Sequence, residues 1–117
     1  MSVQKIKYTY LIVSDMDAAV AFYTAGLGLR LKFQDGQRWA ELDAGGGTTL
    51  ALSSAEESGL RHDGPIVVFQ ADQAEGLRAT LEGQGARAVS ERDMGGHGRL
   101  VAYRDPFGGV FQILEKP

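Results

Sequence analysis

The chain runs through the same succession of hydrophobic and polar patterns twice. Residues 8–13 and residues 66–71 are largely apolar in both of their alternating sets of side chains, which is typical of strands that are covered on both faces. A capped helix is predicted after each of these strands, and three further strands after each helix. Two copies of one βαβββ unit are the simplest interpretation of this repeat.

Each predicted helix has polar residues at its start and glycine at its end. Ser14 and Asp15 precede the first helix, whose apolar stripe has the spacing of one helix face and consists of Met16, Ala19, Val20 and Tyr23. The second helix is predicted to begin at a capping box over residues 72–75, Asp-Gln-Ala-Glu, and to stop at Gly85. We expect residues 1–5 to be loosely held before the first strand.

Alternation in the remaining strands separates two faces. Residues 29–33, 38–42 and 48–53 are predicted strands of the first unit, and residues 86–90, 98–103 and 109–114 those of the second. In the second strand of this set, Ala40 and Leu42 face one way, and Trp39 and Glu41 the other. Three glycines at 45–47 join two strands and open no helix, so they predict a hairpin turn rather than a phosphate-binding loop.

Length and composition indicate a single domain. The 117 residues, 44% of them hydrophobic, suffice for one core but not for two independent ones. A net charge of -3 with scattered Lys and Arg indicates no nucleic-acid partner. The absence of cysteine excludes disulfides and thiolate ligands. No apolar run reaches membrane-spanning length and no signal peptide is evident, so we expect a cytoplasmic protein without a membrane partner.

Two stretches carry a resemblance to a known family. Residues 10–23 (Tyr-Leu-Ile-Val-Ser-Asp-Met-Asp-Ala-Ala-Val-Ala-Phe-Tyr) are followed by Gly-Leu-Gly-Leu, and the chain closes on Asp-Pro-Phe-Gly-Gly-Val-Phe-Gln-Ile at residues 105–113. These stretches resemble the vicinal oxygen chelate superfamily, which contains glyoxalase I, extradiol dioxygenases, fosfomycin-modifying enzymes and bleomycin-resistance proteins. The resemblance extends over about residues 6–115.

The resemblance implies an α+β fold. Two tandem βαβββ units, about residues 6–54 and 65–115 with a linker at about 55–64, are expected to form a curved, incompletely closed mixed sheet with helices on its outer face. Members of this length commonly pair as homodimers, and exposed sheet edges favour the same arrangement here. We therefore predict a homodimer.

The resemblance also implies where a metal ion would bind. In metal-dependent members, ligands on the first and last strands of each unit hold a divalent ion, and these positions fall here at Tyr8, near Ala51, at Ile66 and at Gln112. Only Gln112 is a plausible ligand, and a weak one, whereas such ions prefer several carboxylates or imidazoles. We expect no metal and no other cofactor.

The strand faces predict instead a pocket for a small molecule. Mostly apolar and aromatic walls with a few polar groups are typical of such sites, and the small side chains at mid-strand favour a cavity over a filled gap or a dimer interface. The predicted wall consists of Tyr8, Tyr10, Ile12, Trp39, Glu41, Ala51, Ser53, Ile66, Val68, Gln70, Gln112 and Leu114.

Two residues are candidates for acid–base chemistry. Glu41 lies beside Trp39, where an apolar environment would suit a carboxylate to proton transfer. His97 lies between glycines and next to Arg99, and the two side chains are candidates to close over a bound anion or carbonyl. An exposed strand glutamate and a surface histidine are the alternatives for Glu41 and His97. Asp105 is explained better as a turn residue than as a catalyst.

Three functions remain open at this stage. The first is a bleomycin-resistance-like protein that sequesters a partly aromatic molecule by stacking on Tyr8, Tyr10 or Trp39. The second is a metal-independent lyase, isomerase or cyclase that uses Glu41 or His97. A metal-dependent dioxygenase or glyoxalase is the third, and it requires that the strand register assumed here be wrong by one residue, because such a slip exchanges the two faces.

Overall fold

The computed structural model describes residues 3–72 and 74–117 and divides the chain into two compact units. The first unit is Tyr8–Ile66, and the second unit combines Met1–Lys7 with Val67–Pro117. Strand β1 (Val3–Ile12) therefore contributes its first residues to the second unit and its last residues to the first. Each unit is one βαβββ repeat, as the sequence pattern predicts.

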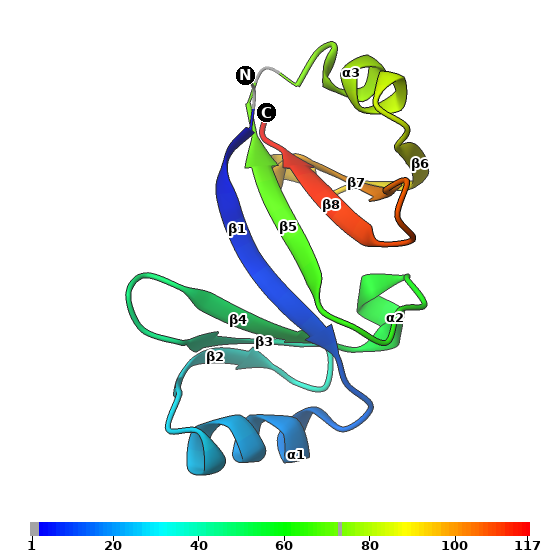
Figure 1. The fold of residues 1–117 in the computed structure, drawn as a ribbon. Coiled ribbons are helices and arrows are strands. Elements are labelled where there is room, and N and C mark those ends of the chain that lie inside the picture. The colour runs from blue at the N-terminus through cyan, green and yellow to red at the C-terminus, as the bar shows by residue number, and fades with distance from the viewer. Residues whose placement is uncertain (1–2, 73) are drawn as a thin grey trace. The chain divides into compact units, whose positions relative to one another are not determined.

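The first unit is a four-stranded sheet with one helix on it (Figure 1). After β1 come α1 (Met16–Ala21), a π-helical turn (Phe22–Gly26), β2 (Arg30–Asp35), β3 (Trp39–Asp43), β4 (Thr49–Ser53) and the short helix α2 (Ala55–Ser58). The strand order is β2-β3-β4-β1. Strand β1 pairs with β4 in parallel, whereas β2, β3 and β4 pair antiparallel.

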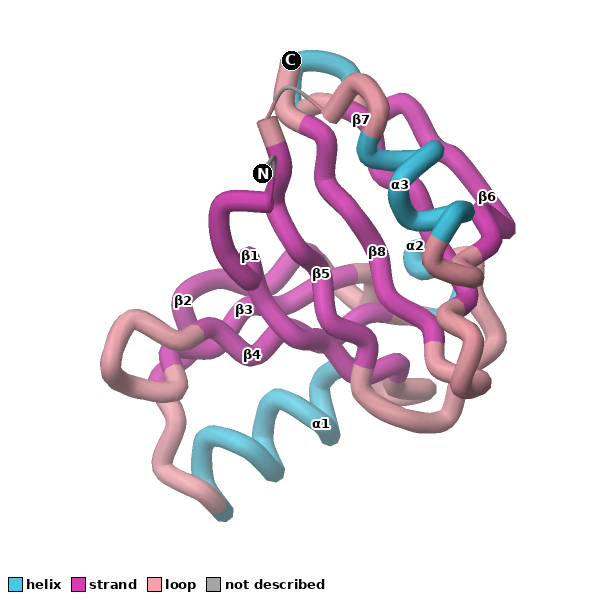
Figure 2. Tube along the Cα trace, turned by 45° about the horizontal axis from the view of Figure 1, so that its top comes forward, coloured by secondary structure: helices cyan, strands magenta, loops and turns pink. Residues whose placement is uncertain are grey.

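The second unit repeats this order. It contains β5 (Ile66–Ala71), α3 (Leu77–Gly83), β6 (Arg87–Asp93), a 3-10 turn (Gly95–His97), β7 (Arg99–Arg104) and β8 (Val110–Glu115). The strand order is β1-β5-β8-β7-β6, in which β5 pairs with β8 in parallel and β8, β7 and β6 pair antiparallel. Helix α3 lies against β6 (Figure 2).

The predicted fold class, α+β with an open mixed sheet, is confirmed. Strand β1 belongs to both sheets, so the eight strands share one hydrogen-bonding order that begins at β2 and ends at β6. Within the described residues β2 and β6 do not pair, so the order does not close into a barrel. No helix in the described part of the chain is long and apolar enough to cross a membrane.

Helix α1 forms the core of the first unit with one face of the sheet. Asp15 caps the helix, since its Oδ1 accepts a hydrogen bond of 3.0 Å from the backbone N–H of Ala18. The helix turns Met16 and Val20 toward the sheet, where they pack on the buried residues Ala40, Leu42 and Leu52. The predicted division of β3 into an Ala40–Leu42 face and a Trp39–Glu41 face is therefore correct.

Helix α3 covers a more aromatic core in the second unit. Tyr103, which is fully buried, stacks on Phe111 with ring centroids 5.4 Å apart and planes inclined by 13°. Phe111 also meets the edge of Phe69 at 6.0 Å. Val101 and Ile113 complete this buried cluster.

Two predicted element boundaries are wrong. Strand β1 begins at Val3 rather than at residue 8, because Gln4 exchanges hydrogen bonds with Gln70 and Asp72 (2.9 and 3.2 Å). Helix α3 begins at Leu77, after a left-handed Gly76, and not at the predicted capping box of residues 72–75. Gln73 of that box lies outside the described residues.

The predicted linker also contains an unforeseen helix. Ser54 caps α2 by accepting a hydrogen bond of 3.0 Å from the backbone N–H of Glu57. A left-handed Gly59 ends this helix after a single turn. The segment after β4 therefore returns to the sheet of the first unit, and Ser58 reaches Tyr10 there, as described below.

The closing turn has the architecture that Asp105-Pro106 predicts. The Asp105 Oδ1 atom accepts hydrogen bonds of 2.8 Å from the backbone N–H groups of Phe107 and Gly109. Gly108 has a φ of +91°, which glycine adopts without strain. Gly109 does not have a positive φ. Asp105 is thus a turn residue.

Candidate functional site

The face of the first sheet opposite α1 collects seven of the predicted pocket residues, among them Ile12, which is the strand partner of Ser53. The strand pairing places Tyr10 opposite Ala51 and Ala51 opposite Glu41, and it likewise places Ser53 opposite Trp39. Directly opposed residues in a sheet point to the same face. We call this surface the aromatic face and define it by Tyr8, Tyr10, Trp39, Glu41, Ala51 and Ser53.

Three rings meet on the aromatic face. The ring centroid of Trp39 lies 5.3 Å from that of Tyr8 and 5.6 Å from that of Tyr10, and the two tyrosine rings are 6.5 Å apart. Their planes are inclined to one another by 54° to 70°, so none of the pairs is a parallel stack. Tyr10 is buried, whereas Tyr8 and Trp39 are half-buried.

Hydrogen bonds fix two of these rings. The indole Nε1–H of Trp39 donates to Glu41 Oε2 at 3.0 Å. The hydroxyl oxygens of Tyr10 and Ser58 lie 2.8 Å apart, which ties α2 to the sheet. Ala51 and Ser53 are fully buried, and the Ser53 hydroxyl donates to the carbonyl oxygen of Ser54 at 2.9 Å. The polar atoms of Tyr10, Trp39 and Ser53 are therefore held in place by residues of the first unit.

The electrostatic environment of Tyr8 is negative. Burial, followed by the charge of Glu41, raises the pKa of the Tyr8 hydroxyl to about 12, and Tyr10 and Glu57 act in the same direction. The Glu57 carboxylate is partly offset by Arg38, whose Nε lies 3.9 Å from it. Among the described residues, the hydrogen-bond partner of the Glu41 carboxylate is the neutral indole of Trp39.

Sequence reasoning missed two residues of this region. Phe33 belongs to the predicted strand 29–33 but was not assigned to the site, and a β-bulge between Leu31 and Phe33 turns it to the side of Glu41, its direct partner. Phe33 is 48% exposed there. Ser58 was assigned to a linker. No local signal marks either position, because both depend on which segments pair.

The predicted residues of the second unit lie on the equivalent face of its own sheet. Val68 is paired with Gln112, and Gln112 with Ala102, on the side that faces away from α3. Gln112 is buried at 3% exposure. Gln70 donates from Nε2 to Gln4 Oε1 at 2.9 Å. Ile66 is fully buried and is the last residue of the first unit.

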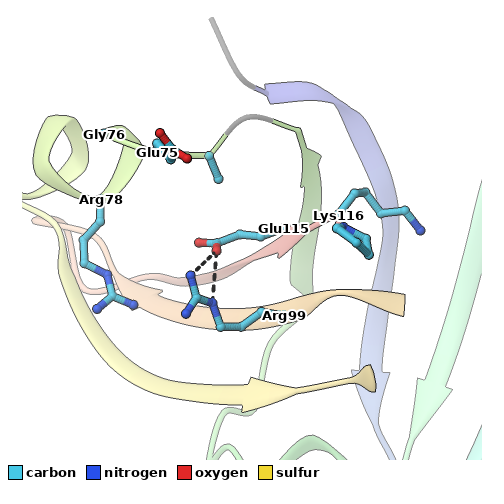
Figure 3. A pocket seen from close by; sticks show the side chains of 8 residues that line it. Glu75, Gly76, Arg78, Arg99, Glu115 and Lys116 are labelled. Carbon is cyan, nitrogen blue, oxygen red and sulfur yellow. Dashed lines mark hydrogen bonds and ion pairs between the residues drawn. The ribbon is translucent and has the colours of Figure 1, made fainter. Parts of the chain in front are cut away.

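The structure does not bring Arg99 to that face. Arg99 is paired with Glu115 and shares the α3 side of the sheet with Val101. Its Nε and Nη2 atoms donate to Glu115 Oε1 at 3.1 and 2.9 Å (Figure 3), and Nη1 lies 3.7 Å from Glu91. Arg78 forms an ion pair with the same Glu91. The guanidinium of Arg99 thus already has two carboxylate partners.

These charged residues border a shallow depression of about 610 Å³ in the second unit (Figure 3). Its lining combines acidic and basic side chains with the end of the chain: Ala74, Glu75, Gly76, Arg78, Arg99, Glu115, Lys116 and Pro117. Because Arg78 and Arg99 are paired with glutamates, the depression offers a bound anion little uncompensated positive charge.

His97 lies in an exposed 3-10 turn. The neighbouring Gly98 has a φ of +109°, and a Cβ at this position would lie 2.1 Å from the carbonyl oxygen of Glu115. This glycine is therefore required by the close approach of two backbone segments.

A family comparison decides the relationship of the chain to known proteins. The model of the Glyoxalase/Bleomycin resistance protein/Dioxygenase superfamily matches residues 5–113. The chain belongs to this superfamily. The resemblance expected from the two sequence motifs is thereby confirmed.

Three solved structures have a similar architecture. An NAD-dependent benzaldehyde dehydrogenase from Legionella pneumophila has a TM-score of 0.74 at 17% identity, covering 94% of this chain and 98% of that one. A methylmalonyl-CoA epimerase from Mycobacterium tuberculosis has a TM-score of 0.68 at 21% identity, and the match covers 98% of this chain and 89% of the epimerase. Homoprotocatechuate 2,3-dioxygenase from Brevibacterium fuscum has a TM-score of 0.70 at 19% identity, and the match covers 98% of this chain and 37% of the dioxygenase chain. These likenesses show the fold alone.

One curated relative matches over part of the chain. An uncharacterized protein from Mycolicibacterium smegmatis (strain ATCC 700084 / mc(2)155) is 43% identical over 54 residues. The match spans 46% of this chain and 45% of the relative.

The residues at the metal positions of the superfamily do not fit a divalent ion. Ala51 and Ile66 carry no donor atom, and Tyr8 and Gln112 alone are a poor set for such an ion. Within residues 3–72 and 74–117, no three His, Cys, Asp or Glu side chains are grouped so that they could hold a metal. The strand register agrees with the prediction on both sheets, so a slip does not supply other ligands.

Proposed function

We propose that this protein binds a small, partly aromatic organic molecule on the aromatic face of its first unit, without a metal ion, and that it acts by sequestration. The observation that carries the proposal is the group of three mutually inclined rings of Tyr8, Tyr10 and Trp39 on the sheet face opposite α1. Rings in such arrangements offer large contact areas to a planar ligand. The membership of bleomycin-resistance proteins in the superfamily supports a role in resistance.

A ligand screen with a matched pair of variants tests this proposal. Trp39 is the only tryptophan in the chain, so its fluorescence reports ligands in the wild-type protein directly. We expect hits from a library of aromatic amines, alcohols and acids to lose about 30-fold in affinity in Trp39→Ala, measured by calorimetry, because a buried aromatic contact contributes about 2 kcal/mol.

The control is Phe107→Ala, which removes an aromatic side chain that is 90% exposed in the closing turn of the second unit. We expect this variant to bind like the wild type. Hits that bind equally well to Trp39→Ala would show that the aromatic face is not the site.

A metal-independent lyase, isomerase or cyclase is the second candidate, and the orientation of Glu41 by Trp39 favours it. A carboxylate held at 3.0 Å from an indole N–H has a defined position from which to move a proton. An enzyme converts a hit to product during long incubation, and Glu41→Gln slows that conversion. A binder leaves the compound intact. His97→Ala tests the other predicted acid–base residue in the same assay.

We also propose that the protein forms a homodimer. Edge strand β2 exposes Leu31 and Phe33, and Phe22 and Leu27 expose further apolar surface on the same unit. Unpaired edges with apolar side chains are usually covered in folded proteins. Light scattering at micromolar concentration should give twice the mass of one chain, and a monomer would contradict this proposal.

A further inference from the structure

The carboxylate of Glu41 is the unusual feature of the aromatic face. Glu41 is half-buried on β3, and its Oε2 accepts one hydrogen bond from the neutral indole of Trp39. No ion pair of Glu41 is found among the described residues. Carboxylates removed from water are normally paired with a cation, because an isolated charge is costly to bury.

Other charges on this face do not compensate Glu41. Lys32 donates from Nζ to Thr49 Oγ1 at 2.7 Å, and the strand partner of Thr49 is Asp43, two residues along β3 from Glu41. Asp43 is itself paired with Arg30 at 2.6 Å. Arg38 lies near Glu57 and Asp35. Each of these three cations therefore has a hydrogen-bond or ion-pair partner other than Glu41.

The rings beside Glu41 favour the same sign of ligand charge. The face of an aromatic ring is negative, and mutually inclined tyrosine and tryptophan rings bind ammonium groups in aromatic cages. The centroids of Tyr8, Tyr10 and Trp39 lie within 6.5 Å of one another. Burial is the largest cause of the raised pKa of the Tyr8 hydroxyl, and the negative charge of Glu41 raises this pKa in the same direction.

We propose that the ligand of the aromatic face carries a positively charged nitrogen, a protonated amine or a quaternary ammonium, which binds against Trp39 and Tyr8 with Glu41 as its counter-ion. This inference rests on the proposed function and adds the charge of the ligand to it. Glu41 then selects cationic over neutral and anionic aromatic molecules, and the rings bind the aromatic body.

Three probes of similar size and different charge test the inference. They are benzyltrimethylammonium, benzyl alcohol and phenylacetate, titrated with Trp39 fluorescence and calorimetry as readouts. We expect the cation to bind at least ten-fold more tightly than the other two probes, and its affinity to fall with added salt. Equal affinity for all three, or tightest binding of phenylacetate, would overturn the inference but leave an aromatic binding face in place.

The substitution Glu41→Gln removes the charge and keeps the shape. Glutamine retains an oxygen that can accept the Trp39 indole hydrogen bond, so the ring arrangement should persist. We expect about ten-fold weaker binding of benzyltrimethylammonium and unchanged binding of benzyl alcohol. Glu82→Gln makes the same chemical change on exposed α3 in the second unit, and we expect no effect there.

The outcomes separate this inference from the proposed function. If Glu41→Gln leaves the affinity for the cation unchanged, or weakens the binding of both probes alike, Glu41 is not a counter-ion. If benzyltrimethylammonium does not bind at all, the charge inference fails, while the wider screen with Trp39→Ala still decides whether the aromatic face binds ligands.

Discussion

The two units place their aromatic side chains on opposite faces of equivalent strands. In the first unit, Tyr10, Ala51 and Glu41 form one row across the sheet on the side away from α1. The corresponding row of the second unit is Val68, Gln112 and Ala102, which has no aromatic residue. The aromatic residues of the second unit, Phe69, Tyr103 and Phe111, lie instead under α3.

This difference shows that one scaffold can use aromatic residues for two purposes. The second unit packs its rings into its core, where burial contributes stability. The first unit builds its core from Met16, Val20, Ala40, Leu42 and Leu52, with Tyr23 packed against it, and keeps the rings carried by its strands β1 and β3 on the other face. The two units also differ in how their charged side chains are paired. Arg99 and Arg78 are paired with glutamates in the second unit, whereas Glu41 in the first has only a neutral donor.

The largest expected effect is on stability and contrasts one ring from each unit. Tyr103→Ala should lower the free energy of unfolding by about 3–5 kcal/mol, because Tyr103 is fully buried and stacks on Phe111. Trp39→Ala should cost roughly half as much, since Trp39 is half-buried. Urea unfolding of the two variants measures both values. Equal losses would mean that the aromatic face is as much a part of the core as the α3 cluster.

A smaller effect concerns the titration of Tyr8. In the folded protein the Tyr8 hydroxyl keeps its proton up to a pKa of about 12, whereas the ordinary value is 10.0. Between these values the folded state binds more protons than the unfolded state, so stability should fall as the pH rises from about 10 to 12, by roughly 2–3 kcal/mol. Tyr8→Phe should remove this part of the pH dependence, and an unchanged slope in that variant would contradict the assignment.

The pKa of Tyr8 also reports on Glu41. Glu41→Gln should lower the pKa of Tyr8, because the charge of Glu41 is the second-largest cause of its elevation. The pKa should stay above its ordinary value, since burial is the largest cause and persists in this variant. NMR of ring-labelled tyrosine measures the change. A pKa that does not move would place Glu41 too far from the ring to act on it.

The smallest effect is expected for Arg99. Arg99→Gln should leave ligand affinity within about two-fold, because Arg99 is paired with Glu115 and Glu91 in the second unit. Exposed ion pairs contribute at most about 1 kcal/mol, so the loss in unfolding free energy should be of that order and should shrink at high salt. Arg104→Gln on the same strand is the control, as Arg104 is exposed. A loss of ten-fold or more in affinity would restore Arg99 as a ligand contact.

The sequence by itself determined the repeat, the fold class and the face of each regular strand. Alternation in β3 separates Ala40 and Leu42 from Trp39 and Glu41, and a slip of one residue would have buried the charged Glu41 beneath α1. The turn at Asp105 was likewise predictable, because an aspartate bonds to the backbone of the next few residues. Signals of this kind are local, because the burial of apolar side chains favours the same alternation of residues in every part of the chain.

Tertiary structure decided the features that depend on which segments pair. The bulge in β2 turns Phe33 toward Glu41, and α2 brings the hydroxyl of Ser58 to within 2.8 Å of the hydroxyl of Tyr10, 48 residues earlier in the chain. The ion pair of Arg99 with Glu115 likewise follows from the register of β7 on β8. A single sequence contains no local pattern for these contacts, because their energy is gained only once distant strands have come together.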